Sequence, residues 1–401
     1  MRSVVHWPTL FTLLTLAACG GGADTALNPP IVDTLPGGIV HVRNTGPTAW
    51  RDTSGWRWTP ATVIKPAEGS PGELGDIASV VIGEDGSVYA LQQGPAVIKA
   101  FGHDGTFVRT IGKEGDGPGE LRRGFLSIRG DTLLIQDAGN SRLTIFRTDG
   151  VLLRTVTSPC CFYWPPFVID SVGRAWVPGR GANNSSSWFR VRMDGSTVDT
   201  MAMPPMKDFS KQKMWNVTVA RGNDRMQMIM PAPMQPATIF SPRVDGMIVA
   251  GYTGRYRFAI LRTSTDTARI FDADAAPIAI TEAQRDTIFA NATANRDEAV
   301  HKALLASAHM DDIPRTWPPW LHMALDGQGY LWVALPGDAG EVSRLQVFDR
   351  EGRLLGNVPP PSPKMFDLPT AWGRDRIAVL DEDTDGRPVI RTFRLTRGDT
   401  P

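Results

Sequence analysis

Three carboxylates at alternate positions form the clearest metal-binding pattern in the sequence. Residues 381–386 begin like a calcium loop, with oxygen ligands spaced two apart and a glycine for the sharp turn. The pattern then breaks, because Thr392 occupies the twelfth position, where a bidentate glutamate is needed. We interpret the run as a polar hairpin turn, with weak calcium binding by Asp381, Asp383 and Asp385 as the alternative.

No arrangement of nucleophile, base and metal ligand that is typical of a hydrolase can be read from the chain. Histidines are few, none belongs to a His-Glu-x-x-His pair, and no Gly-x-Ser-x-Gly segment occurs. The glycine-dense run 112–119 lacks the Gly-Lys-Ser/Thr ending of a phosphate loop, so we interpret it as a connector. No cofactor is therefore predicted, and the residues favour a binding protein over an enzyme.

The cysteines point to the cell envelope. Residues 10–16 form an apolar run that is too short to span a bilayer, which takes about 20 residues, and Arg2 precedes it, as in a secretory signal. The run ends in Leu16-Ala17-Ala18-Cys19. This ending resembles the lipobox of bacterial lipoproteins, which implies cleavage after residue 18 and acylation of Cys19. An ordinary secretory signal with a chance cysteine is the alternative.

Cys160 and Cys161 are adjacent and are the remaining cysteines of the chain. In an oxidising compartment they could close on each other as a strained vicinal disulfide. Two reduced, partly buried thiols in a loop are the alternative. No second Cys or His pair stands at a spacing that would complete a metal site.

Charge and composition narrow the remaining classes of function. Lys and Arg total 42 and Asp and Glu total 42, so the formal net charge is zero, which argues against a nucleic-acid partner. The 40 glycines and 32 prolines favour a fold with many tight turns. The expected class is all-β.

Internal repeats show how these turns are organised. Residues 141–153 and 343–355 share an alternating strand, an acidic residue followed by glycine, and a second strand, and residues 98–108 are a weaker copy. A second motif, Gly-x-apolar-aromatic-apolar, precedes them at residues 86–90 and 329–333. Six such units, each unable to bury an apolar face alone, predict a six-bladed β-propeller.

Residues 137–143 resemble the NHL-type repeat, whose Asp, Asn and Arg precede an alternating strand, as Asp137, Asn140 and Arg142 do here. The whole mature chain is similar to six-bladed propeller lipoproteins of bacterial envelopes, NHL-repeat-like or TolB-like.

The last unit holds three strands, and we expect residues 38–43 to supply the fourth and close the ring, which would remove an exposed sheet edge.

We therefore divide the chain into a signal peptide (1–18), a flexible tether (19–37) and the propeller (38–401). Two insertions are expected, at about 206–236, which is rich in methionine, and at about 278–315. Thr281 and Gln284 have the form of a capping box, and helical spacing of apolar residues follows. We expect this helical segment to cover one face of the disc. The pairs at 164–167 and 317–320, rich in Trp and Pro, are expected to pack between blades.

The favoured function is a lipid-anchored binding or protein-interaction module of the cell envelope. We expect the protein to be anchored at the outer membrane and to face either the periplasm or the cell surface. Its expected partners are the membrane, through the lipid, and a protein or small molecule at one face of the propeller; the chain is expected to be a monomer. The alternative is a metal-dependent hydrolase or lyase, similar to propeller lactonases and esterases, with its site at the central channel.

Overall fold

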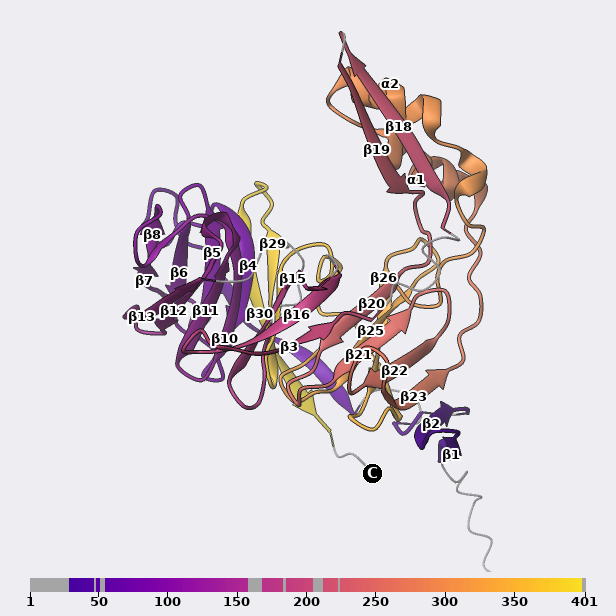
Figure 1. Cartoon of the computed structure of the whole chain (residues 1–401), viewed down its shortest axis with the longest axis horizontal. Helices are drawn as coiled ribbons and strands as arrows, with labels where there is room; N and C mark the ends of the chain where they lie inside the picture. The colour runs from indigo at the N-terminus through magenta and orange to yellow at the C-terminus, as the bar shows by residue number, and fades with distance from the viewer. Residues whose placement is uncertain are drawn as a thin grey trace, which may run out of the picture.

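The computed structural model describes residues 29–46, 48–50, 55–157, 168–182, 185–204, 212–222 and 224–398. In this part of the chain, six antiparallel sheets follow one another in sequence and surround a central channel. The molecule is a six-bladed β-propeller. In each blade one edge strand lies innermost, beside the channel, and the other strands follow outward in the order in which they pair (Figure 1).

The first three blades run in simple order from the inside to the outside. Blade 1 comprises β4 (Asp76–Ile82), β5 (Val88–Gln93), β6 (Val97–Phe101) and β7 (Phe107–Ile111). Blade 2 comprises β10 (Gly124–Arg129), β11 (Thr132–Asp137), β12 (Arg142–Arg147) and β13 (Leu152–Thr157), and between the two blades lie the short strands β8 (Lys113–Glu114) and β9 (Glu120–Leu121). Blade 3 comprises β14 (Val168–Ile169), β15 (Arg174–Arg180), β16 (Ser186–Arg192) and β17 (Thr197–Ala202).

Two of the other three blades, blades 4 and 6, recruit strands from the N-terminal region. Blade 4 comprises β20 (Thr238–Pro242), β21 (Ile248–Tyr252), β22 (Arg257–Leu261) and β23 (Thr267–Ala273), and it is extended by β2 (Ile39–Asn44) and β1 (Ile31–Leu35). Blade 5 comprises β24 (His322–Leu325), β25 (Leu331–Pro336), β26 (Val342–Phe348) and β27 (Leu354–Val358). Blade 6 comprises β28 (Thr370–Trp372), β29 (Arg376–Glu382), β30 (Pro388–Arg397) and β3 (Trp56–Ile64).

The sequence repeats coincide with the outer hairpins of the blades, as predicted. Residues 141–153 contain β12 and the turn to β13, and residues 343–355 hold the same position in blade 5. In the blade 5 turn, the Asp349 carboxylate accepts the backbone N–H groups of Glu351 and Arg353. Gly352 follows with a φ of +80°, a conformation that glycine adopts at little cost. The turn chemistry thus fixes each hairpin locally.

A separate apolar cluster fills each of the six spaces between neighbouring blades. Phe101 and Leu380, for example, share the cluster between blades 6 and 1, and Trp176 and Ile248 share the cluster between blades 3 and 4. Trp320, which belongs to the Trp-Pro-Pro-Trp segment, is fully buried between blades 4 and 5, as expected. The segment at 164–167 lies outside the described residues. Six radial interfaces of this kind close the ring.

The strand that closes the ring is not the predicted one. Residues 38–43 contain most of β2, which pairs in parallel with β23 on the outer edge of blade 4. The final sheet is completed by β3, which pairs with β30 in antiparallel register from Trp56↔Arg397 to Ile64↔Ile390. Residues 56–59 alternate apolar and polar side chains as residues 40–43 do, so this local pattern could not decide between the two strands. Trp56 decides it through packing, because this side chain fills the space between blades 5 and 6.

The expected tether is also shorter than predicted. Residues 31–35 form β1, which pairs with β2, so the folded region begins before residue 38. The chain then follows the outer rim from blade to blade. Asn44 donates to Gly352 O and accepts from Leu354 N, and Trp50 N donates to Leu355 O; all three partners belong to blade 5. The N-terminal segment thereby binds blades 4, 5 and 6 together.

The two insertions form one unit. The hairpin β18 (Met214–Arg221) and β19 (Asp224–Pro231) packs against α2 (Glu298–Ser307), beside α1 (Glu282–Thr293). Trp215 and Leu304 lie in their shared apolar core. We call this unit the arm. Figure 1 shows that it projects away from the blades, so the helices pack on the hairpin and not across a face of the disc as predicted.

Local signals specified the helices of the arm correctly. The Thr281 hydroxyl accepts Gln284 N, and the Gln284 side chain accepts Thr281 N, which is the predicted capping box. Asp297 caps α2 in a similar way, by accepting the N–H groups of Ala299 and Val300. Among the described residues, neither these helices nor the 3-10 turns (138–140 and 310–312) are long and apolar enough to cross a membrane.

Candidate functional site

The central channel is a cavity with a volume of about 1170 Å³. All six inner strands contribute to its wall. We call the end where the inner strands turn into the second strands the turn end, and the opposite end the connector end. A cavity of this size exceeds what most drug-sized ligands fill, so the channel is wide enough for a small molecule with its water.

Aromatic side chains enter the wall from every second blade. Phe125 on β10, Phe240 on β20 and Trp372 on β28 line the channel, and each is partly exposed. Two of the rings are supported by a neighbouring ring: Phe240 packs edge-on against Trp188 with ring centroids 5.2 Å apart, and Trp372 lies 5.7 Å from Trp332. Rings held in this way offer an apolar surface that needs little reorganisation to bind a ligand.

Hydroxyl groups supply most of the polar lining between these rings. Ser79, Ser127, Ser241 and Thr370 lie on four different inner strands. Three of them are engaged in the fold: Ser79 Oγ accepts Leu126 N, Thr370 Oγ1 donates to Met365 O, and Ser241 Oγ donates to Pro242 O. An apolar wall with a few neutral polar groups is the usual character of a small-molecule pocket.

Charged residues gather at the turn end. Glu84, Arg129 and Arg374 are exposed there, on blades 1, 2 and 6. Arg129 donates to Ser171 O and so bridges blades 2 and 3. The described lining contains Asp326 as a further charged group, and it contains no histidine and no cysteine.

Asp326 is the buried carboxylate of the channel wall, with 4% of its surface exposed. Its Oδ1 accepts the backbone N–H groups of Gln328 and Tyr330, and its Oδ2 accepts the Trp332 indole N–H at 3.2 Å. Arg397 Nη2 approaches Oδ2 at 3.4 Å from the end of β30. The Arg397 guanidinium also stacks on Trp56, 4.6 Å from the ring centroid, so this contact links blade 5 to the closing strand.

Asp170 occupies the same position in blade 3 but has a different electrostatic environment. Its Oδ2 accepts both the Trp176 indole N–H and Arg174 Nε, the latter at 2.8 Å. Burial opposes ionisation of Asp170, but hydrogen bonds from the Arg174 backbone, the Trp176 indole and the Arg174 side chain outweigh it and lower its pKa. In blade 5 a tyrosine stands where Arg174 stands in blade 3. Burial therefore dominates at Asp326 and raises its pKa to about 6.

This contrast predicts a pH-dependent stability difference. Because the pKa of Asp326 is higher in the folded state, its ionisation opposes folding, and its contribution is fully present below about pH 4 and lost as the pH rises through about 6. The unfolding free energy of the native protein minus that of Asp326→Asn should fall by about 2.4 kcal/mol between pH 4 and 7. Denaturant titrations at several pH values measure it. The same difference, measured with Asp170→Asn, should not fall over this pH range, since the pKa of Asp170 is lowered. If both differences changed with pH in the same way, the opposite pKa shifts of Asp326 and Asp170 would be contradicted.

The predicted calcium residues lie at the turn between β29 and β30, away from the channel lining. Asp383 Oδ1 accepts the N–H groups of Asp385 and Arg387, and its Oδ2 lies 3.0 Å from Lys65 Nζ. Asp381 pairs with Arg391. These carboxylates are used in a turn and in ion pairs, and the described residues contain no group of three or more His, Cys, Asp or Glu that could hold a metal ion. Cys19, Cys160 and Cys161 lie outside the described residues.

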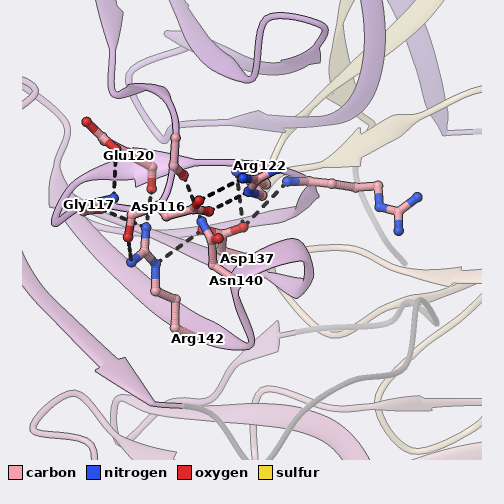
Figure 2. Close-up of polar contacts among 9 residues, drawn as sticks. Asp116, Gly117, Glu120, Arg122, Asp137, Asn140 and Arg142 are labelled. Carbon is pink, nitrogen blue, oxygen red and sulfur yellow. Dashed lines mark hydrogen bonds and ion pairs between the residues drawn. The ribbon is translucent and has the colours of Figure 1, made fainter.

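The residues that resemble an NHL repeat form a polar network beside the connector between blades 1 and 2 (Figure 2). Asp137 is fully buried; its carboxylate accepts Arg122 N and Asn140 Nδ2 and lies 3.3 Å from Arg142 Nε. Arg142 donates to the carbonyls of Asp116, Gly117 and Glu120. The network holds the connector onto blade 2, so its role is structural.

Sequence reasoning missed the channel aromatics. They lie on inner strands, just before the turns that mark the second strands, and these turns were recognised. The sequence does contain a sign of them: in every second unit, an aromatic residue stands one to five positions before the turn that leads to the second strand. Their convergence, however, depends on the ring being closed, which no single repeat contains.

Comparisons with known proteins add a fold-level likeness. No family model matches the chain, and no curated protein matches its sequence. A protein from Bacteroides fragilis shares 12% identity with a TM-score of 0.47, covering 89% of this chain and 99% of its own. Virginiamycin B lyase from Staphylococcus aureus shares 10% (TM-score 0.41; 84% and 99%), and AztD from Citrobacter koseri shares 14% (TM-score 0.35; 79% and 88%). At these values no family or activity is assigned, and the fold is established by the six sheets themselves.

Proposed function

We propose that this chain is a lipid-anchored binding module of the cell envelope that holds an apolar or aromatic small molecule in its central channel. The observation that carries the proposal is the channel wall, in which three aromatic rings from alternate blades line a cavity of about 1170 Å³ among neutral hydroxyls. Apolar contact supplies the binding free energy at such a wall, and the hydroxyls orient the ligand.

A lipid on Cys19 would keep this module at the membrane, which agrees with the signal sequence and lipobox-like residues at 10–19. No observation in the structure favours the metal-dependent hydrolase or lyase, whose ligands would have to converge on the channel axis. Binding is therefore the function that we carry forward.

A fluorescent apolar probe tests the channel. N-phenyl-1-naphthylamine should bind the purified protein with enhanced emission, and Phe240→Ala should weaken its binding by on the order of tenfold, because one aromatic wall is lost. The matched control is Phe107→Ala on β7, since Phe107 is also partly exposed and packs edge-on against a neighbouring ring, Phe101, but does not line the channel. Equal effects of the two variants, or no saturable binding, would overturn the proposal.

A further inference from the structure

The tether joins the propeller at one defined place on its rim. The first described strand, β1, is the outermost strand of the six-stranded sheet of blade 4, and it pairs with β2 alone. Cys19 lies only twelve residues before Ile31. A fully extended chain of this length spans about 40 Å, and a flexible one averages about 20 Å between its ends.

This reach is shorter than the propeller is wide. A compact domain of this size is about 50 Å across. Blade 1 lies opposite blade 4 in the six-bladed ring. A lipid on Cys19 therefore keeps the blade 4 rim within reach of the bilayer surface. A propeller that stands on this rim holds the blade 1 rim a full diameter further away.

The beginning of β1 has the composition of a surface that contacts lipid. Ile31 is 45% exposed and Val32 is 56% exposed, and neighbouring residues of a strand point to opposite faces. Each face of this edge strand thus presents one apolar side chain at the end next to the tether. At a membrane interface, such side chains gain free energy by leaving water.

We propose that the anchored propeller stands edge-on at the membrane, with the edge strand β1 of blade 4 resting on the lipid surface. The inference rests on the proposed lipid anchor at Cys19. In this orientation the channel axis runs along the membrane, so both channel ends are open to solvent. Figure 1 shows the arm on the opposite side of blade 4 from β1, so the arm extends away from the membrane.

Energy transfer to the bilayer tests the orientation. The full-length lipoprotein is expressed with a keto amino acid in place of Val32, Val108 or Ile229, which avoids the native cysteines, and is labelled with a donor dye. These positions lie on β1, on the blade 1 rim and on the arm, and all three are well exposed, at 56%, 51% and 70%. The protein is reconstituted into vesicles of phosphatidylethanolamine and phosphatidylglycerol that carry an acceptor on the headgroups.

We expect transfer from position 32 to exceed transfer from positions 108 and 229 by at least about threefold, given a domain about 50 Å across. A double variant, Ile31→Asn with Val32→Asn, carries the donor at Leu35 instead. It should show a smaller difference in energy transfer between β1 and position 108. The control variant, Val151→Asn with Leu153→Asn, changes two exposed apolar residues on the blade 2 rim and should leave this difference unchanged. Equal transfer from positions 32 and 108 would overturn the edge-on orientation.

Mass spectrometry of the N-terminal peptide separates this inference from the anchor itself. Acylated Cys19 with equal transfer from all positions refutes the orientation and leaves the lipoprotein assignment intact. An unmodified Cys19, or vesicle association that survives Cys19→Ser unchanged, refutes the anchor, and with it the basis of the orientation.

Discussion

Replacing Asp137 with alanine should lower the free energy of unfolding by about 3–5 kcal/mol, because it removes one member of a buried ion pair and leaves its partners behind. Arg142 has a side chain that is only 13% exposed, and it would lose its carboxylate partner Asp137 while it still donates to three carbonyls. Asn140 Nδ2 would lose its bond of 2.8 Å to Asp137. Guanidinium chloride titration followed by circular dichroism measures the change.

Asp116→Ala is the matched control within the same network. The Asp116 carboxylate pairs with Arg122 at the surface, where both side chains are more than half exposed. Ion pairs of this kind contribute about 0–1 kcal/mol, so the variant should be close to the native protein in stability. If Asp116→Ala destabilised the protein as much as Asp137→Ala, the buried carboxylate would not be the centre of the network.

Trp56→Ala should be equally severe, with a loss of about 3–5 kcal/mol, because a large buried aromatic side chain would leave a cavity at the closure of the ring. Trp56 is 1% exposed and contacts residues from three parts of the chain: Trp50, with ring centroids 4.9 Å apart, Trp332 at 6.0 Å and the guanidinium of Arg397. Thermal and denaturant unfolding measure the loss.

Trp58→Ala provides the comparison for this variant. Trp58 lies two residues further along the same strand and contacts Trp332, but it is only partly buried. Its removal should cost clearly less than removal of Trp56. A Trp56→Ala protein with native stability would mean that β3 does not close the propeller, and the N-terminal segment would then need another role.

Local sequence patterns were sufficient for the individual blades. The alternating strands, the acidic turns such as Asp349 with Gly352, and the capping box at Thr281 all act between residues a few positions apart. A turn residue satisfies its own neighbours, so its effect is the same in any surroundings. The number of units followed from counting these turns, and the radial assembly followed because one unit cannot bury its own apolar face.

The assignment of the N-terminal strands could not be predicted in the same way. Residues 40–43 and 56–59 both alternate apolar and polar side chains, and either strand could complete a three-stranded sheet. The contacts that decide between them join residues more than 300 positions apart, such as Thr62 N with Thr392 Oγ1. Trp56 fits the space between blades 5 and 6, whereas Val42 fits the apolar cluster between blades 4 and 5. These preferences exist only once the other blades are in place.

The amino-acid sequence by itself therefore determined the class of fold, the six repeated units, their turns and the signals at the N-terminus, because each depends on short stretches of chain. The tertiary structure alone decided which strand closes the ring, that the two insertions form one arm, and that Phe125, Phe240 and Trp372 face a common channel. Each of these outcomes needs side chains from distant blades to meet, and their meeting is set by the packing of the whole ring.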